Sequence, residues 1–213
     1  MPALIFDCDG VLADTERDGH LPAFNAAFAE FDLPIRWDEA TYAEKLKIGG
    51  GKERIASDLP GQDEPIKQLH ARKTRLFTER VDAGLLPGRP GIRRLISAVD
   101  ALGWTIAVAS TSAEPSVRAV LAHAVGEELA GRVHVYAGDI VAAKKPAPDI
   151  YLKVLDELRL NPGECLVVED SGIGVASAQA AGLTTIVTIS SFTASDDFTG
   201  AALVVDHLGE ADQ

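Results

Sequence analysis

The stretch Leu4-Ile5-Phe6-Asp7-Cys8-Asp9-Gly10 decides the fold, because a wholly apolar run ends in two carboxylates and a glycine. An apolar run without alternating polar residues is typical of a strand buried on both faces, as in a parallel sheet. Residues two apart on a strand share a face, so Asp7 and Asp9 point the same way, and Gly10 permits a sharp turn after them. A carboxylate beside a second carboxyl that gives and takes a proton suits covalent phosphoryl transfer.

An Asp-x-Asp-Gly sequence also occurs in calcium-binding loops and in ordinary turns. A calcium loop requires further oxygen ligands, and the side chains of Val11, Leu12 and Ala13 cannot supply them. A calcium loop also does not follow a buried strand. The sequence therefore favours a site at the carboxyl end of a strand.

Short apolar runs recur along the chain and alternate with helical patterns. We expect further strands at 105–109, 133–136, 166–168, 185–187 and 202–205. The helical patterns lie at 91–102, 114–125, 150–160 and 172–181. This alternation predicts an α/β fold with a doubly wound parallel sheet.

Residues 18–83 interrupt the alternation, because they contain helical patterns and no strand candidate. One long predicted helix carries an apolar face there, made of Ile66, Leu69, Leu76, Phe77 and Val81. The turn sequence Leu86-Pro87-Gly88-Arg89-Pro90-Gly91 then returns the chain to the sheet. We predict an all-helical cap, 18–83, inserted after the first strand of an α/β core that comprises 1–17 and 84–213.

The composition is that of an ordinary globular protein: 46% of the 213 residues are hydrophobic and 24% are charged. A net charge of −12 argues against nucleic acid and against anionic membranes as partners. The charge is uneven, since residues 41–80 carry a net +3 and the remainder −15. This distribution indicates that part of the cap faces a small anionic substrate, although a solvated helix surface would show the same pattern.

No feature of the sequence predicts export or membrane insertion. The N-terminus has no basic region followed by an apolar stretch, and no apolar window reaches the roughly 18–20 residues of a membrane span. Cys8 and Cys165 follow no metal-binding spacing and are expected to be reduced core residues. We therefore expect a cytoplasmic protein, and we expect it to be a monomer.

Four carboxylates follow two of the predicted strands, Asp7 and Asp9 after the first and Glu169 and Asp170 after 166–168. In an open α/β sheet, ligands bind outside the carboxyl ends of the strands. Two carboxylates ~4 Å apart repel each other by about 4 kcal/mol at an effective dielectric constant of ~20. A cation relieves this repulsion, and all-oxygen ligands suit Mg²⁺. The sequence therefore predicts a magnesium site at this edge of the sheet.

Two further stretches carry groups that bind anions. In Lys144-Lys145-Pro146-Ala147-Pro148-Asp149, which precedes a predicted helix, Lys145 would balance the carboxylates and hold a phosphoryl oxygen. Ser110-Thr111-Ser112 ends a strand and precedes a helix. Its hydroxyl groups either cap that helix or, together with free N–H groups, bind an anion, and the two roles are compatible.

Taken together and in this order, these stretches resemble the four motifs of the haloacid dehalogenase superfamily. The motifs are Ile5–Leu12, Val108–Thr111, Lys145–Asp149 and Val168–Gly174. The helical insertion resembles the C1 cap of the β-phosphoglucomutase-like branch. The resemblance implies a Rossmann-like core.

Within that branch the chain is most similar to the CbbY-type phosphatases, on residues 23–28, 49–55 and 144–151. This resemblance implies a Mg²⁺-dependent phosphatase that is associated with the Rubisco operon and dephosphorylates xylulose-1,5-bisphosphate, an inhibitory by-product. The family pattern has a hydroxyl residue where this chain has Gly49. That difference removes a possible hydrogen bond to the substrate and leaves the exact sugar open.

The resemblance also implies roles for the carboxylates. Asp7 would attack phosphorus and become an aspartyl phosphate, while Asp9 would protonate the leaving sugar oxygen and then activate water. Mg²⁺ would lie between Asp7, Asp170 and the backbone carbonyl of Asp9, with Glu169 adjacent. Positioning and charge neutralisation would then account for most of the catalysis.

The remaining roles implied by the resemblance concern the substrate. Ser110 and Lys145 would hold the phosphoryl group. The sugar and its distal phosphate would meet Glu16, His20, Tyr42, Gly50, Lys52, Arg54, Thr111 and Ser112. From its sequence context alone, His20 could equally be a helix-surface histidine.

Three alternative functions remain open at this point. A β-phosphoglucomutase has the same core and the same aspartyl phosphate, and sequence barely separates it from a phosphatase. A phosphorylation-driven signalling receiver, which is not an enzyme, would need neither Asp9 nor a cap of about 65 residues. A dehalogenase would lack the acidic pair Glu169-Asp170 for Mg²⁺.

Overall fold

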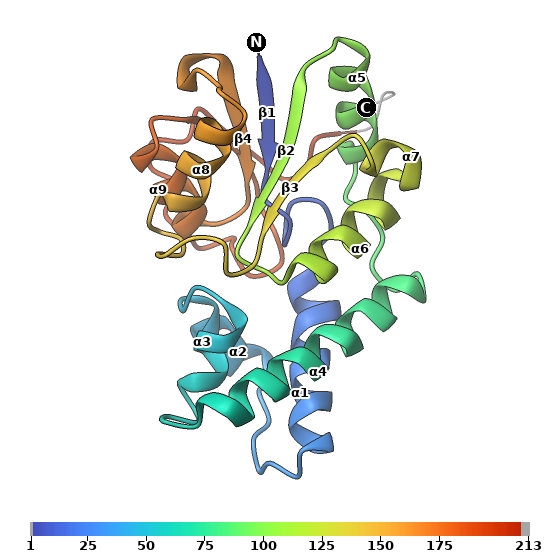
Figure 1. Cartoon of the computed structure of the whole chain (residues 1–213), viewed down its shortest axis with the longest axis vertical. Coiled ribbons are helices and arrows are strands. Elements are labelled where there is room, and N and C mark those ends of the chain that lie inside the picture. The colour runs from blue at the N-terminus through green and yellow to red at the C-terminus, as the bar shows by residue number, and fades with distance from the viewer. Residues whose placement is uncertain (1, 210–213) are drawn as a thin grey trace.

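The part of the chain that the structure describes, residues 2–209, contains six strands in one parallel sheet (Figure 1). The strands are β1 (Ala3–Phe6), β2 (Thr105–Ser110), β3 (His134–Ala137), β4 (Cys165–Glu169), β5 (Thr184–Thr188) and β6 (Leu203–Val205). In this computed structural model their order across the sheet is β3-β2-β1-β4-β5-β6, with β1 paired in parallel to β2 and β4. The predicted doubly wound sheet is confirmed, and each predicted strand is present.

Helices cover both faces of this sheet. They are α5 (Ile92–Ala101), α6 (Glu114–Val125), α8 (Asp149–Glu157) and α9 (Gly172–Ala180). In β1, Leu4 and Phe6 belong to the apolar cluster that contains α5 and α6, whereas Ala3 and Ile5 belong to the cluster with α8 and α9. Burial on both faces explains why the strand is apolar throughout and does not alternate with polar residues.

Two short elements of this lobe were not predicted from the sequence. They are α7 (Glu127–Ala130) and the 3₁₀ turn η2 (Pro162–Glu164). Gly126, which has φ 91°, separates α7 from α6, and Asn161 caps η2 by accepting a hydrogen bond from the N–H of Gly163 at 3.1 Å. Both elements connect a helix to the strand that follows.

The second lobe is helical, as predicted, and lies below the sheet in Figure 1. Its elements are the π-turn η1 (Glu16–His20), α1 (Leu21–Glu30), α2 (Glu39–Leu46), α3 (Gly51–Ala56) and α4 (Asp63–Asp82). Pro22 lies in the first turn of α1, and the side chain of Asp38 caps α2 by accepting from the N–H of Thr41 at 2.7 Å. The division at residues 18 and 83 remains a prediction.

The helical lobe has an apolar core of its own. Its buried members are Leu21, Phe24, Ala27, Phe28, Trp37, Tyr42, Ile55, Leu59, Ile66 and Leu69. The far end of α4 reaches the other lobe, because Phe77 and Val81 belong to the apolar cluster of the sheet, while Leu76 is half-buried. A single long helix therefore connects both cores and fixes the helical lobe beside the sheet.

Within residues 2–209, no helix has the length and apolar character needed to cross a membrane. Cys8 and Cys165 are free thiols, and both are buried, in agreement with their prediction as core residues.

Candidate active site

Asp7 directly follows β1, and its N–H donates to the carbonyl oxygen of Val168 at 2.9 Å. Lys145, which is also buried, donates to the Asp7 carboxylate at 2.8 Å and to Glu169 Oε1 at 2.6 Å. The same ammonium donates to the carbonyl oxygen of Ala109 in β2 at 3.0 Å. Burial lowers the pKa of Lys145, but Asp7 and Glu169 raise it by more, so the net pKa lies well above its ordinary value. Lys145 is therefore a permanent cation that joins three strand ends.

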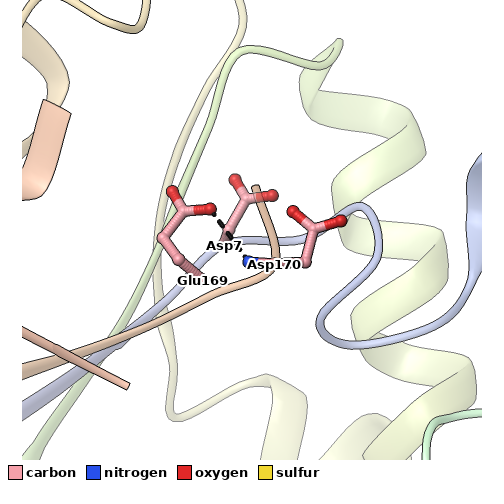
Figure 2. A group of neighbouring side chains, drawn as sticks. All are labelled: Asp7, Glu169 and Asp170. Carbon is pink, nitrogen blue, oxygen red and sulfur yellow. Dashed lines mark hydrogen bonds between the residues drawn. The ribbon is translucent and has the colours of Figure 1, made fainter. Parts of the chain in front are cut away.

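Asp7, Glu169 and Asp170 form a buried acidic cluster whose carboxylate oxygens lie within 4.8 Å of one another. Figure 2 shows the three side chains pointing to the same side of the strand ends. Burial raises the pKa of Asp7, Lys145 lowers it and Glu169 raises it, with a net value of about 7. Burial, followed by the charges of Glu169 and Asp7, raises the pKa of Asp170 well above its ordinary value. One ammonium does not balance three carboxylates.

Two glycines leave the space that these carboxylates occupy. A Cβ atom on Gly10 would lie 1.9 Å from Asp170 Oδ2, and Gly10 also has a φ of 78°, which disfavours other residues. A Cβ atom on Gly174 would lie 2.0 Å from Glu169 Oε2. Both backbones must therefore approach the cluster closely.

The residues of the cluster fit a divalent cation. Their donors are all carboxylate oxygens, the set that Mg²⁺ prefers. A bound cation would also favour the ionised forms of Asp7 and Asp170, whose raised pKa values show that the cluster lacks positive charge. Asp7, Asp170 and Glu169 are thus the side chains that could hold the metal.

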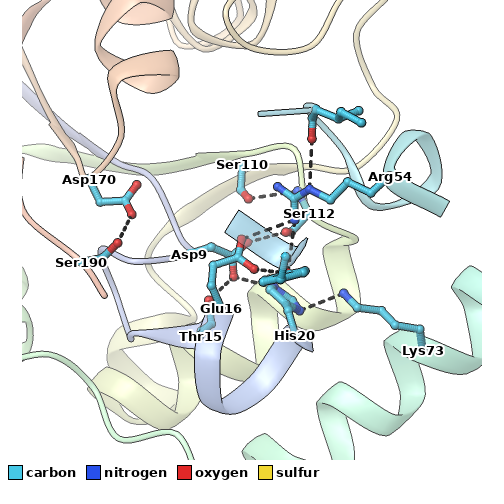
Figure 3. A network of polar contacts seen from close by, with 12 residues as sticks. Asp9, Thr15, Glu16, His20, Arg54, Lys73, Ser110, Ser112, Asp170 and Ser190 are labelled. Carbon is cyan, nitrogen blue, oxygen red and sulfur yellow. Dashed lines mark hydrogen bonds and ion pairs between the residues drawn. The ribbon is translucent and has the colours of Figure 1, made fainter. Parts of the chain in front are cut away.

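The side chain of Asp9 is not part of this cluster and belongs to a separate network (Figure 3). Oδ1 accepts from Thr15 and lies 2.7 Å from His20 Nε2, and Oδ2 accepts from Ser112. Burial raises the pKa of Asp9, but His20, followed by the hydrogen bonds from Ser112 and Thr15, lowers it by more. The carboxylate of Asp9 is therefore held in one orientation by three partners.

His20 connects Asp9 to Lys73, which projects from α4 (Figure 3). His20 Nδ1 lies 2.8 Å from Lys73 Nζ, and the His20 ring stacks on Phe77 with centroids 4.0 Å apart. Since an ammonium can only donate, Nδ1 accepts and Nε2 carries the proton shared with Asp9. Burial lowers the pKa of Lys73 to about 8, although Glu16 and Asp9 raise it.

A cavity between the two lobes brings most predicted site residues together, with about 850 Å³ of empty space including its open mouth. Its walls include eleven of them: Asp7, Asp9, Glu16, His20, Gly50, Arg54, Ser110, Thr111, Ser112, Lys145 and Asp170. The Ser110 hydroxyl accepts from the N–H of Ser112 at 3.1 Å, so its own hydrogen remains available. A phosphoryl group on Asp7 would therefore meet hydroxyl and ammonium donors.

Glu16 and Arg54 line the cavity from the helical lobe, and Tyr42 lies behind them, fully buried. The Tyr42 hydroxyl donates to Glu16 Oε2, and Arg54 Nη1 lies 3.5 Å from Glu16 Oε1. Arg54 Nε donates to the carbonyl oxygen of Ile48 at 3.0 Å. Tyr42 thus orients Glu16, and Arg54 presents a fixed positive charge to the cavity.

Lys52 does not line this cavity. Its ammonium pairs with Asp139, on the loop after β3. Gly50, in contrast, lies in the cavity wall with φ 98°. Lys52 and Arg54, which lie close in the sequence, therefore face different surroundings.

Sequence reasoning missed four residues that hold the site together. Thr15 and Lys73 support Asp9 and His20, Tyr151 donates to Glu169 Oε1 at 2.5 Å, and Ser190 donates to Asp170 Oδ2 at 2.6 Å. Only Tyr151 had a local signal, since it is the last residue of the stretch 144–151 that carries the resemblance. Lys73 lies in a charged run of α4 that has the pattern of a solvated surface.

The chain is similar to known proteins over nearly its whole length. Residues 1–182 match the family model for haloacid dehalogenase-like hydrolases. A CbbY protein encoded on a plasmid of Cupriavidus necator is 47% identical, over 99% of this chain and 87% of that protein. A CBBY-like protein of Arabidopsis thaliana is 45% identical, over 98% of this chain and 69% of that protein. The crystal structure of a mutant CbbY from Rhodobacter sphaeroides with xylulose-1,5-bisphosphate has a TM-score of 0.90 at 38% identity, covering 98% and 95% of the two chains.

Proposed function

Because the chain belongs to the haloacid dehalogenase-like hydrolases and is a phosphatase, we propose that it hydrolyses a small sugar bisphosphate, with xylulose-1,5-bisphosphate as the leading candidate. The CbbY structure that contains this bisphosphate supports the choice, since this chain shares its fold at 38% identity. The lining of the cavity suits a small phosphorylated sugar, because it combines ammonium, guanidinium and hydroxyl donors with a carboxylate. The reaction would proceed through an aspartyl phosphate and would require Mg²⁺.

In the first half of the proposed reaction, Asp7 attacks the phosphorus atom of the sugar phosphate. The ammonium of Lys145 contacts the carboxylate of Asp7, so its positive charge offsets the negative charge of the phosphoryl group that Asp7 attacks. Ser110 donates its free hydroxyl hydrogen to a phosphoryl oxygen. The leaving sugar oxygen takes its proton from the carboxyl of Asp9, which recovers that proton from the attacking water in the second half; His20 Nε2, 2.7 Å from Oδ1, orients the carboxyl.

In the second half, water hydrolyses the phosphoryl group on Asp7. Asp9, now ionised, accepts a proton from the attacking water, and the three hydrogen-bond partners of Asp9 favour that ionised state. The bond from phosphorus to the Asp7 oxygen breaks, which releases inorganic phosphate and restores the carboxylate. Asp9 thus acts first as an acid and then as a base.

Asp7, Asp170 and the backbone carbonyl of Asp9 would hold Mg²⁺, with Glu169 adjacent. When bound, the metal supplies positive charge that screens the carboxylates from the phosphoryl oxygens and stabilises the transition state. Glu169 mainly positions Lys145, because its Oε1 accepts hydrogen bonds from both Lys145 and Tyr151.

The second phosphate of the substrate would meet the helical lobe. Arg54 and Lys73 project into the cavity from α3 and α4. The pKa of Arg54 is raised and that of Lys73 is about 8, so both side chains are predominantly positively charged at neutral pH. Glu16, between them, accepts hydrogen bonds and suits a sugar hydroxyl. This arrangement would favour a bisphosphate over a monophosphate, because charge-assisted hydrogen bonds are each worth about 1.5–3 kcal/mol.

One observation carries the proposal: buried Asp7, with a buried lysine on one oxygen and two further buried carboxylates beside it, faces a cavity that also exposes Asp9. The test measures phosphate release from a panel of sugar mono- and bisphosphates with Mg²⁺ and after chelation. We expect the largest kcat/KM for xylulose-1,5-bisphosphate, no activity after chelation, and a kcat at least about 10⁴-fold lower for Asp7→Asn. A folded Asp7→Asn protein with near-normal turnover would exclude the covalent route.

The mutase alternative is tested in the same assay. A mutase converts glucose 1-phosphate to glucose 6-phosphate and excludes water from the phosphorylated aspartate, whereas a phosphatase releases phosphate. The receiver alternative does not stand, because the chain is an enzyme of a hydrolase family. The dehalogenase alternative is also disfavoured, since Glu169 and Asp170 belong to the buried acidic cluster.

A further inference from the structure

A group of four charged residues joins the two lobes beside the cavity and has no part in the proposed reaction. Lys52 and Glu53 belong to α3, while Asp139 and Lys144 belong to the loop between β3 and α8. Lys52 and Asp139 are 87 residues apart in the sequence. In Figure 1, α3 lies directly below that loop.

The four charges alternate in sign and contact each other across the lobe boundary. Asp139 Oδ2 accepts from Lys52, and Asp139 Oδ1 lies 2.9 Å from Lys144 Nζ. Lys144 Nζ also lies 2.7 Å from Glu53 Oε1. Asp139 and Lys144 are therefore the two middle members, and each contacts one opposite charge from each lobe. Hydrogen bonds from both lysines lower the pKa of Asp139 to about 2, so it is ionised at any assay pH.

The backbones of the two lobes lie so close near this cluster that no side chain fits between them at Gly49. A Cβ atom on Gly49 would lie 2.7 Å from the carbonyl oxygen of Lys145, and one on Gly50 would lie 2.7 Å from Lys144 Nζ. The cluster thus fixes the helical lobe directly against the residue whose side chain contacts Asp7. Residues from both lobes line the cavity, so its shape depends on this contact.

We propose that Asp139 is a positioning residue that keeps the helical lobe closed over the cavity by binding Lys52 and Lys144 at once. The proposal rests on the proposed function, in that closure completes the site for phosphoryl transfer. It also assigns Lys52 to lobe closure, and not to the distal phosphate. Closure precedes chemistry for every substrate, so the loss of Asp139 lowers kcat/KM equally for a bisphosphate and for p-nitrophenyl phosphate.

The test compares Asp139→Asn and Lys52→Gln with the matched control Lys47→Gln. Lys47 lies on the same lobe, pairs with Glu44 alone and has a side chain 69% exposed. We expect kcat/KM to fall roughly three- to twenty-fold for Asp139→Asn, since it removes two partly exposed ion pairs. Lys52→Gln removes one pair and should lose roughly two- to five-fold, whereas Lys47→Gln should retain wild-type activity.

Hydrogen exchange of the folded variants supplies a readout that does not depend on the substrate. In Asp139→Asn we expect faster amide exchange in peptides that cover 48–56 and 138–145, with unchanged exchange in β1 and β4. The double variant Lys52→Gln with Asp139→Asn should lose less activity than the product of the two single losses, because both substitutions remove the same ion pair.

Three results would overturn the proposal. They are unchanged exchange in both segments, fully independent losses in the double variant Lys52→Gln with Asp139→Asn, and a loss confined to bisphosphates, which would make Lys52 a selectivity residue. A different result would contradict the proposed function, namely a wild-type protein that prefers another class of substrate. In that case p-nitrophenyl phosphate and hydrogen exchange still decide the role of Asp139.

Discussion

Gly174 controls the placement of Glu169, and through it the placement of Lys145. A Cβ atom at Gly174 would lie 2.1 Å from the carboxyl carbon of Glu169, so Gly174→Ala must displace that carboxylate. Since a displacement of about 1 Å near reacting groups costs on the order of 10²-fold, we expect kcat to fall about 10²-fold. Steady-state kinetics with any accepted phosphate ester would measure the change.

The matched control for this substitution is Gly163→Ala. A Cβ atom there would meet only Asn161 Oδ1 at 3.6 Å, which is ordinary contact. We expect this variant to have normal activity. Equal kcat values for Gly174→Ala and wild type, with both proteins folded, would show that the position of Glu169 is unimportant.

The site residues that could be predicted from the sequence are those that lie at the carboxyl end of a buried strand. Asp7 and Asp170 directly follow buried strands and Glu169 ends one, and parallel strands bring their carboxyl ends to one edge. Thr15, Lys73 and Ser190 could not be predicted in the same way, because each contacts the site through a tertiary packing contact that has no local pattern. The side-chain orientation of Asp9, toward His20 and away from the acidic cluster, likewise depends on residues of both lobes.

Among the elements, α4 links catalysis to the helical lobe. Lys73 is buried on this helix, with Nζ 4.4 Å from the centroid of the Phe24 ring, and it fixes the proton of His20 on Nε2. Lys73→Met keeps the apolar chain and removes the ammonium. We expect kcat to fall roughly ten- to 100-fold, since acid–base catalysis contributes about 10²–10⁴-fold and Lys73 acts on it only through His20.

The pH dependence separates this role from a structural one. Burial lowers the pKa of Lys73 to about 8, so the wild-type kcat should decline above about pH 8 as the ammonium deprotonates. The profile of Lys73→Met should lack that decline. Lys67→Met, which changes an exposed lysine on the same helix, should keep the wild-type profile. If kcat of Lys73→Met still declined above about pH 8, the decline would belong to a group other than Lys73.

Elements with several turns or a continuous apolar run could be predicted, and shorter ones could not. The helix at 114–125 was predicted with its observed bounds, and each strand was found within one or two residues. In contrast, α7 has four residues and η1 is a single π-turn, so neither contains a full period of apolar residues. The helical lobe was predicted from the absence of strand patterns, but its contact with the loop after β3 was not.

At the scale of the whole molecule, part of the acidic balance lies buried where the sheet ends. The net charge of −12 includes three buried carboxylates around a single ammonium, an arrangement that opposes folding when the metal is absent. Stability and function therefore compete at the same residues. The metal-free protein should show this conflict as a pH-dependent loss of stability.

The sign of that dependence follows from Asp7, whose pKa is about 7 in the folded protein and 3.8 ordinarily. Between these values the folded state binds more protons than the unfolded state, so the free energy of unfolding decreases as pH rises from about 4 to about 7. The raised pKa of Asp170 acts in the same direction. Burial lowers the pKa of His70 to about 3, so His70 makes the free energy of unfolding increase with pH. This contribution is the same in the wild type and in a variant of Asp7, so it cancels when the two are compared.

We therefore expect Asp7→Asn to gain stability over the metal-free wild type as pH rises. The difference in unfolding free energy should be smaller at pH 5 and should grow to at most about 4 kcal/mol at pH 8, since each pKa unit corresponds to about 1.4 kcal/mol. Urea unfolding in EDTA at pH 5, 6, 7 and 8 would measure it. Adding Mg²⁺ at pH 8 should stabilise the wild type more than the variant, because the metal binds the folded carboxylates. Parallel pH profiles for the two proteins would show that repulsion around Asp7 does not limit the stability of the metal-free fold.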